Sequence, residues 1–125
     1  MYFSFIVPVY NRPDEVDELL ESLTKFTSNI PFEVVIIEDG STIPCHSIIE
    51  KYSHKVTISY FFKPNSGPGD SRNFGMQNAK GDYFIILDSD CIIPSDYLIH
   101  VQKSLDLEYV DCFGGHVAAL DSFSD

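Results

Sequence analysis

Two carboxylates spaced one residue apart, Asp88 and Asp90, follow directly after an uninterrupted apolar run at positions 83–87. A run of this kind, with no polar alternation, predicts a central strand of a parallel sheet, buried on both faces. Strand periodicity would turn both carboxylates to the same side, where their mutual repulsion favours a cation between them. Hard carboxylate oxygens suit Mg2+ or Mn2+. The alternative is a solvated turn, in which Asp and Ser are common residues.

Three further segments carry polar groups that could face a ligand. Asp39 lies in an Asp-Gly-Ser turn after an apolar run, where it either caps the turn or accepts hydrogen bonds from a base or a ribose. Gly67-Pro68-Gly69 precedes a predicted helix, and a helix N-terminus behind a glycine-containing loop favours an anion. Arg72 in that helix suits a phosphate or a base edge, with a solvated surface arginine as the alternative.

Strand patterns and helix patterns alternate along the chain. Strands are predicted at 2–9, 32–37, 56–62, 83–87 and 109–120, and helices at 14–26, 44–52, 71–80 and from 94 onwards. This alternation predicts an α/β fold with a mostly parallel, Rossmann-like sheet and helices on both faces. Ligands of such sheets bind at the carboxyl ends of the strands, so the polar residues that follow the strands are expected to share one pocket.

The composition limits the size and the partners of the domain. The chain has 125 residues, 44% of them hydrophobic, which predicts one domain over residues 1–125. A net charge of −11 disfavours nucleic acid and anionic membranes as partners. No apolar run approaches the roughly 20 residues of a transmembrane segment and no signal peptide is evident, so a cytoplasmic location is expected. Cys45, Cys91 and Cys112 are expected to be reduced, mostly buried thiols.

Four ordered motifs resemble the nucleotide-binding half of a family 2 glycosyltransferase of the GT-A fold. They are Phe5 to Arg12 (FIVPVYNR), Ile36 to Ser41 (IIEDGS), Asn65 to Asn73 followed by Ala79 to Tyr83, and Leu87 to Asp90 (LDSD). The ordered set covers nearly the whole chain and is far more specific than any single motif. Three places depart from the family's common pattern: Glu38 replaces an aspartate, Cys91 replaces an acidic or amide residue, and Asp70-Ser71 stands where small residues usually precede the arginine. The first two could alter the surroundings of the metal.

The resemblance implies a sugar-nucleotide site with a Mn2+ or Mg2+ ion. The implied nucleotide-binding residues are Pro8, Val9 and Tyr10 beside the base, Asp39 bonded to the base, Gly67 and Arg72 close to the nucleotide, Asp88 near the ribose, and Ser89. Asp88 and Asp90 are the implied metal ligands, and Asp90 assists departure of the diphosphate through the metal. The implied reaction transfers a sugar, with inversion, from a nucleotide donor, UDP-sugar favoured, to a saccharide or another hydroxyl acceptor.

The resemblance also implies that the acceptor-binding region and the catalytic base of the family lie beyond Asp125. Residues 1–125 are therefore expected to bind a donor without transferring its sugar, and the full-length protein can still be membrane-associated. The apolar segment 109–120 is expected to form a strand whose uncovered edge promotes self-association.

Three alternatives remain from the residues themselves: a non-catalytic nucleotide-binding module, a DxD-type phosphotransferase and a nucleotidyltransferase. A DxD-type phosphotransferase normally carries that motif on its first strand, and a nucleotidyltransferase carries a Gly-rich, basic loop after its first strand. Here the DxD residues follow the fourth predicted strand, and the first is followed by Tyr10-Asn11-Arg12-Pro13. Both patterns favour the glycosyltransferase.

Overall fold

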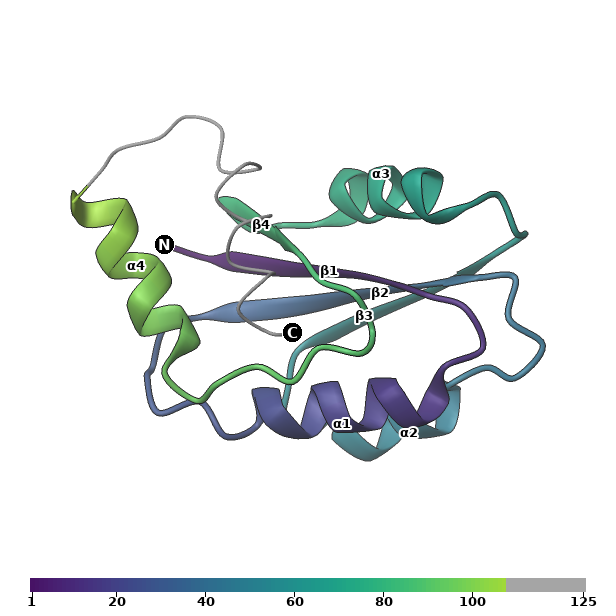
Figure 1. Cartoon of the computed structure of the whole chain (residues 1–125), viewed down its shortest axis with the longest axis horizontal. Coiled ribbons are helices and arrows are strands. Elements are labelled where there is room, and N and C mark those ends of the chain that lie inside the picture. The colour runs from purple at the N-terminus through teal and green to yellow at the C-terminus, as the bar shows by residue number, and fades with distance from the viewer. Residues whose placement is uncertain (108–125) are drawn as a thin grey trace.

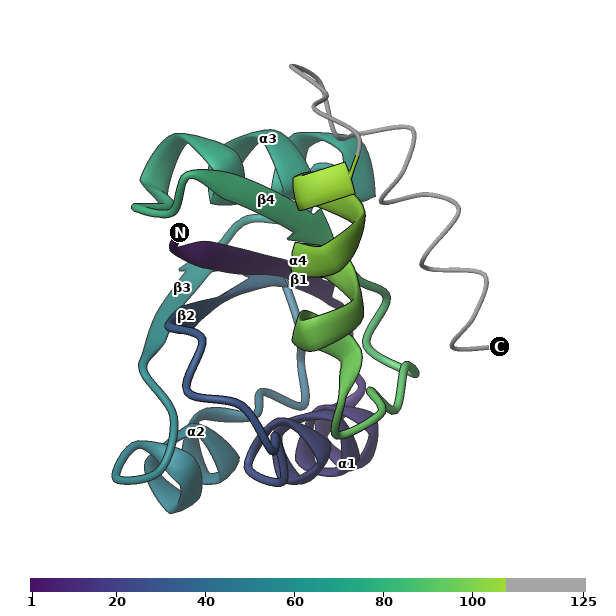
Figure 2. The same ribbon diagram turned by 90° about the vertical axis from the view of Figure 1, so that its left-hand side faces the viewer.

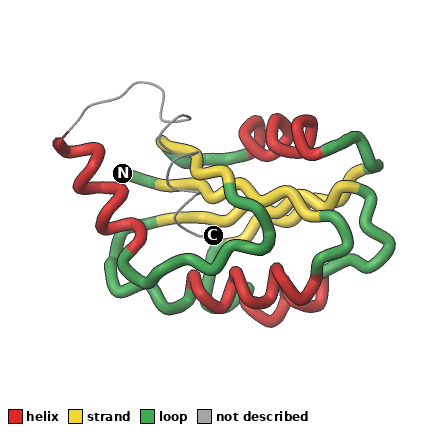
Figure 3. Tube along the Cα trace, in the orientation of Figure 1, coloured by secondary structure: helices red, strands yellow, loops and turns green. Residues whose placement is uncertain are grey.

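Strands and helices alternate along the described part of the chain, as the sequence predicts (Figure 1 and Figure 3). The structure, a computed structural model, describes residues 1–107. In chain order the elements are β1 (Phe3–Val9), α1 (Pro13–Leu23), β2 (Phe32–Asp39), α2 (His46–Tyr52), β3 (Ile58–Lys63), α3 (Pro68–Asn78), β4 (Tyr83–Ile86) and α4 (Tyr97–Leu107). The predicted strand at 109–120, with its proposed self-association, and Cys112 lie outside the described residues.

The strands of the described region form one parallel sheet in the order β3-β2-β1-β4. β1 pairs with β2 starting at Phe3↔Phe32, and with β4 starting at Phe3↔Tyr83. The predicted α/β fold with a parallel sheet is confirmed. Within residues 1–107 β4 pairs with β1 at the end of the strand order, and because the predicted fifth strand lies outside the described residues, the central place of 83–87 stays a prediction. Parallel pairing brings the carboxyl ends of the strands to one edge.

Helices cover both faces of the sheet (Figure 2). α1 and α2 lie on one face, and α3 lies on the other. Alternate side chains of β1 serve the two layers: Phe3 and Phe5 join the core that includes α1, whereas Ile6 packs with the group that includes Phe74 of α3. This two-sided burial explains why the strands are continuously apolar in sequence.

α4 closes the core at the amino-terminal end of the strands, away from their carboxyl edge (Figure 1). Its residue Tyr97 belongs to the same core as Phe5, and the two rings lie 6.2 Å apart. Phe26 lies beyond the end of α1, although the apolar period predicted a helix through it. Its ring packs 5.1 Å from that of Phe32, so a tertiary contact, and not helical continuation, explains its place in the apolar pattern.

Cys45 and Cys91 are buried, as predicted. Burial raises the pKa of the Cys45 thiol to about 12, and the nearby Glu38 carboxylate acts in the same direction. Cys45 is therefore a poor nucleophile. Within residues 1–107, none of the helices has the length and apolar character that crossing a bilayer requires.

Candidate functional site

A pocket of about 590 Å³ opens where the loops that follow the four strands meet. It is lined by Pro8, Val9, Tyr10, Arg12, Glu15, Asp39, Asn65, Gly67, Pro68, Arg72, Asp88, Ser89 and Asp90. All nine residues predicted for the site are among them. Arg12, Asn65 and Pro68 were not assigned roles, although they stand inside the recognised motifs and could have been found from that position. Glu15 carried no signal beyond its place in the first turn of a predicted helix.

Asn11 ties the loop after β1 to the loop after β2. Its φ of 52° lies in the left-handed region, which Asn adopts more readily than most residues. Its Oδ1 accepts hydrogen bonds from the backbone N–H groups of Thr42 at 2.8 Å and Ile43 at 3.0 Å, and its own N–H donates to the Ser41 hydroxyl at 2.9 Å. The preceding residue, Tyr10, is exposed and lines the pocket, where it offers an aromatic surface to a planar group.

Glu38 is fully buried and does not line the pocket. Its carboxylate accepts hydrogen bonds from the Ser41 hydroxyl, the Cys45 N–H and the Tyr60 hydroxyl, each at 2.6 Å. Glu38 therefore anchors the loop after β2. Its predicted effect on the surroundings of a metal stays a prediction. Cys91, a second departure from the family pattern, is likewise buried in the core.

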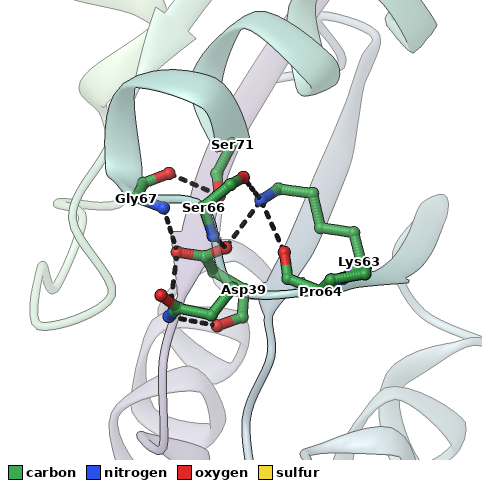
Figure 4. Close-up of polar contacts among 7 residues, drawn as sticks. Asp39, Lys63, Pro64, Ser66, Gly67 and Ser71 are labelled. Atoms are coloured by element: carbon green, nitrogen blue, oxygen red, sulfur yellow. Dashed lines mark hydrogen bonds and ion pairs between the residues drawn. The ribbon is translucent and has the colours of Figure 1, made fainter.

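Asp39 is 5% exposed, and its carboxylate already holds the loop after β3 (Figure 4). It accepts hydrogen bonds from Lys63 Nζ at 2.6 Å, from the Ser66 N–H at 2.8 Å and from the Gly67 N–H at 2.9 Å. The Asn65 side-chain amide donates to the backbone oxygen of Asp39 at 2.9 Å. Burial raises the pKa of Asp39, but Lys63 and the two N–H donors outweigh it, so the pKa lies below its usual value. A contact with a base would add to this structural role and stays a prediction.

The lowered pKa of Asp39 predicts a pH-dependent contribution to stability. The unfolded state binds a proton on the Asp39 carboxylate more tightly than the folded state does. The stability that this carboxylate contributes is therefore complete above the ordinary pKa of 3.8, and it is lost as the pH falls through the lower pKa of the folded state. We expect Asp39→Asn to cost about 1–3 kcal/mol near neutral pH. Urea unfolding should show this difference from the parent shrinking below about pH 4. Asp70→Asn, at an exposed position of α3, is the control, and a difference independent of pH would contradict the assignment.

Asp88 and Asp90 lie in a turn and not on a strand, since β4 ends at Ile86 and the Cys91 N–H donates to the Asp88 backbone oxygen at 3.2 Å. Strand periodicity therefore does not place these two carboxylates, contrary to the prediction, although both line the same pocket. The Ser89 hydroxyl between them donates to Glu15 Oε1 at 2.9 Å. This bond joins the turn to the first turn of α1.

The carboxylates suit a divalent cation that a ligand helps to hold. Within residues 1–107, no three His, Cys, Asp or Glu side chains are grouped to bind a metal ion by themselves. Mg2+ and Mn2+ accept one or two carboxylates when waters and substrate phosphates supply the other oxygens. The lining contributes four carboxylates and two guanidinium groups. One of the four carboxylates, that of Asp39, is paired with Lys63. The residual negative charge would repel an anionic ligand unless a cation accompanied it.

α3 begins at the pocket, three residues earlier than predicted. Gly67 has a φ of 101°, which L side chains rarely adopt, and Pro68 occupies the first helical position, where no N–H is needed. The N–H and the hydroxyl of Ser71 both donate to the Gly67 oxygen at 3.1 Å. Arg72 follows on this turn and lines the pocket, whereas Asn73 is exposed and does not.

A parallel sheet with a pocket at the carboxyl ends of its strands defines an α/β domain of the class that binds its ligands at this edge. Residues 4–122 match the model of glycosyl transferase family 2. The chain therefore belongs to glycosyl transferase family 2.

Its curated relatives are much longer proteins. The chain is 36% identical over 116 residues to poly(ribitol-phosphate) beta-N-acetylglucosaminyltransferase TarS of Staphylococcus aureus. The aligned region covers 89% of this chain and 20% of TarS. It is 45% identical over 93 residues to an uncharacterized glycosyltransferase of Haemophilus influenzae, covering 73% of this chain and 30% of that protein. The chain thus spans a minor part of the relatives that it matches.

Solved structures share the arrangement of the sheet and helices. The crystal structure of S. aureus TarS 1-349 in complex with UDP-GlcNAc superposes with a TM-score of 0.80 at 37% identity, covering 89% of this chain and 33% of that one. Mannosyltransferase PcManGT from Pyrobaculum calidifontis, in complex with GDP-Man and Mn2+, gives a TM-score of 0.73 at 23% identity, covering 82% and 32%. The second likeness shows the fold alone.

Proposed function

We propose that this chain is the donor-binding part of an inverting, metal-dependent glycosyltransferase. Its donor is a nucleotide-sugar, with a UDP-sugar favoured, and its acceptor is a saccharide or another hydroxyl compound. The observation that carries the proposal is the convergence in one pocket of all nine residues predicted for a sugar-nucleotide site. Membership of family 2 and the likeness to TarS, whose crystal structure contains UDP-GlcNAc, support it.

The lining residues supply the groups that such a donor requires. Pro8, Val9 and Tyr10 offer an apolar and aromatic surface for the base. Asp39 orders the adjoining loop and can accept a further hydrogen bond. Arg72, on the first turns of α3, is suited to the phosphates.

The cation position is proposed at the turn after β4. Asp90, assisted by Asp88, would hold Mn2+ or Mg2+ there. When bound, the ion would supply positive charge against the charge that develops on a departing diphosphate. The two carboxylates themselves would repel the diphosphate, so in this site they serve the donor only through the cation.

The alternative functions have less support. Family membership favours glycosyl transfer over a phosphotransferase or a nucleotidyltransferase. A non-catalytic nucleotide-binding module remains the second candidate, because the chain spans 33% of the TarS fragment whose structure contains UDP-GlcNAc. The expectation that residues 1–125 bind a donor without transferring its sugar stays a prediction.

Calorimetric titration of residues 1–125 with UDP, GDP and dTDP, each with and without Mn2+, tests the proposal. We expect UDP to bind most tightly, because a uridine donor is favoured, and Mn2+ to raise its affinity about tenfold or more. Failure of all three nucleotides to bind, with and without Mn2+, would refute the proposed function.

A further inference from the structure

Lys63 lies at the end of β3 and directs its ammonium group at Asp39 (Figure 4). Besides the Asp39 contact at 2.6 Å, it donates to the Pro64 backbone oxygen at 3.2 Å and to the Ser66 hydroxyl at 2.5 Å. Asp39 and Lys63 are partners in the register of β2 and β3, so the backbone of the sheet sets their approach. Lys63 itself does not line the pocket.

This ion pair differs from the other lysine–aspartate pair of the described region. The side chains of Lys63 and Asp39 are 12% and 7% exposed, whereas those of Lys51 and Asp17 are 60% and 35% exposed. Solvent screens the exposed pair, so it contributes little. Removal of one member of a nearly buried pair leaves the other charge without compensation, and this is costly.

The contacts of the pair extend to the pocket wall. Lys63 and Asp39 together bind the hydroxyl and the N–H of Ser66, and Asp39 binds the Gly67 N–H. The Gly67 oxygen in turn accepts the hydrogen bonds of Ser71 at the start of α3, the helix that carries Arg72. A continuous set of hydrogen bonds therefore leads from Lys63 to the loop 65–67 and to the helix behind it.

We propose that Lys63 is a positioning residue of the nucleotide site. It keeps the Asp39 carboxylate compensated and oriented, and through Asp39 it holds the loop 65–67 in the shape that receives the donor. The nucleotide readout of this inference rests on the proposed function. The measurement on the free protein does not depend on the proposed function, because the hydrogen bonds to Ser66 and Gly67 form without a ligand.

The test compares Lys63→Met, Lys63→Arg and the control Lys51→Met in residues 1–125. Amide hydrogen exchange of the free proteins, followed by NMR, reports on the Ser66 and Gly67 N–H groups directly. We expect Lys63→Met to accelerate exchange at both amides about 10- to 100-fold, the effect of weakening hydrogen bonds to a charged group. UDP affinity without metal should fall about tenfold or more. Lys63→Arg should restore much of both properties, and Lys51→Met should change neither.

Two further variants complete the test. In the Lys63→Met background, Asp39→Asn should cost far less UDP affinity than it does in the parent, because Lys63 acts through Asp39. Ser66→Ala removes only one acceptor of Lys63 at an exposed position, and it should accelerate exchange at the Gly67 amide. If Lys63→Met does not fold, the exchange rate of the Gly67 amide in Ser66→Ala tests the role of Lys63 instead.

Unchanged exchange at Ser66 and Gly67 in Lys63→Met, or in Ser66→Ala if Lys63→Met does not fold, would overturn the inference. Additive effects of Lys63→Met and Asp39→Asn, or no rescue by Lys63→Arg, would also overturn it. A parent that binds no nucleotide would refute the proposed function alone, because the exchange rates of the free protein would still test the role of Lys63.

Discussion

Asp90→Ala is expected to abolish the effect of Mn2+ on UDP affinity while the metal-free affinity is retained or improved. Asp90 is exposed in the turn after β4 and lines the pocket with Asp88 and Ser89, so its removal leaves the hydrophobic core intact. Asp90 is the proposed main ligand of the cation and Asp88 only assists it, so the variant loses the stronger of the two carboxylate contacts. We expect an enhancement by Mn2+ of about tenfold or more in the parent to fall to about twofold or less.

Isothermal titration with UDP, with and without Mn2+, measures this difference. Asp70→Ala is the matched control, because it removes the same charge from an exposed position in the first turn of α3 that does not line the pocket. Circular dichroism of the variants checks the fold. Equal enhancement by Mn2+ in Asp90→Ala and the parent would discard the metal assignment.

Gly40→Ala is expected to destabilise the domain and to weaken nucleotide binding together. Gly40 has a φ of +72°, and an added Cβ would lie 2.7 Å from the backbone N of Asn65 and 2.8 Å from the Asn65 Cβ. Both the backbone strain and the clash oppose the alanine, since the atoms it meets are not the free end of a flexible side chain. We expect a loss of roughly 2–4 kcal/mol in the free energy of unfolding.

Nucleotide affinity should fall with stability in Gly40→Ala, because Asn65 lines the pocket and must move to admit the methyl group. Urea unfolding and metal-free UDP titration measure the two effects. Gly69→Ala is the control: no heavy atom lies within 4 Å of its added Cβ, and it stands in the first turn of α3. A Gly40→Ala variant as stable as Gly69→Ala would show that the contact between the two loops is not tight.

The alternation of strands and helices could be predicted because it depends on local patterns. The segment Phe3–Val9 is apolar at nearly every position, which indicates burial on two faces whatever lies next to it. The helix Pro13–Leu23 presents Val16, Leu19, Leu20 and Leu23 at helical spacing, and all four are buried. Local patterns do not predict the order of the strands, which is β3-β2-β1-β4 among the described ones.

Most members of the candidate pocket could also be predicted, for a topological reason. Residues that follow parallel strands meet at one edge, so Tyr10, Asp39, Arg72 and Asp90 share a pocket although 80 positions separate the first from the last. The positions of the strand ends and the common direction of the strands are sufficient to predict this grouping, and no side-chain contact has to be known.

The sequence by itself thus determined the α/β class, the two-sided helical cover and nine of the thirteen residues that line the pocket. Only the tertiary structure decided what each side chain does there. Asp39 is held by Lys63, 24 positions away, and Ser89 by Glu15, 74 positions away, while Glu38 is withdrawn from the pocket into a buried network. The physical reason is that hydrogen-bond partners are set by strand register and loop packing. Neither strand register nor loop packing produces a periodic pattern in the amino-acid sequence.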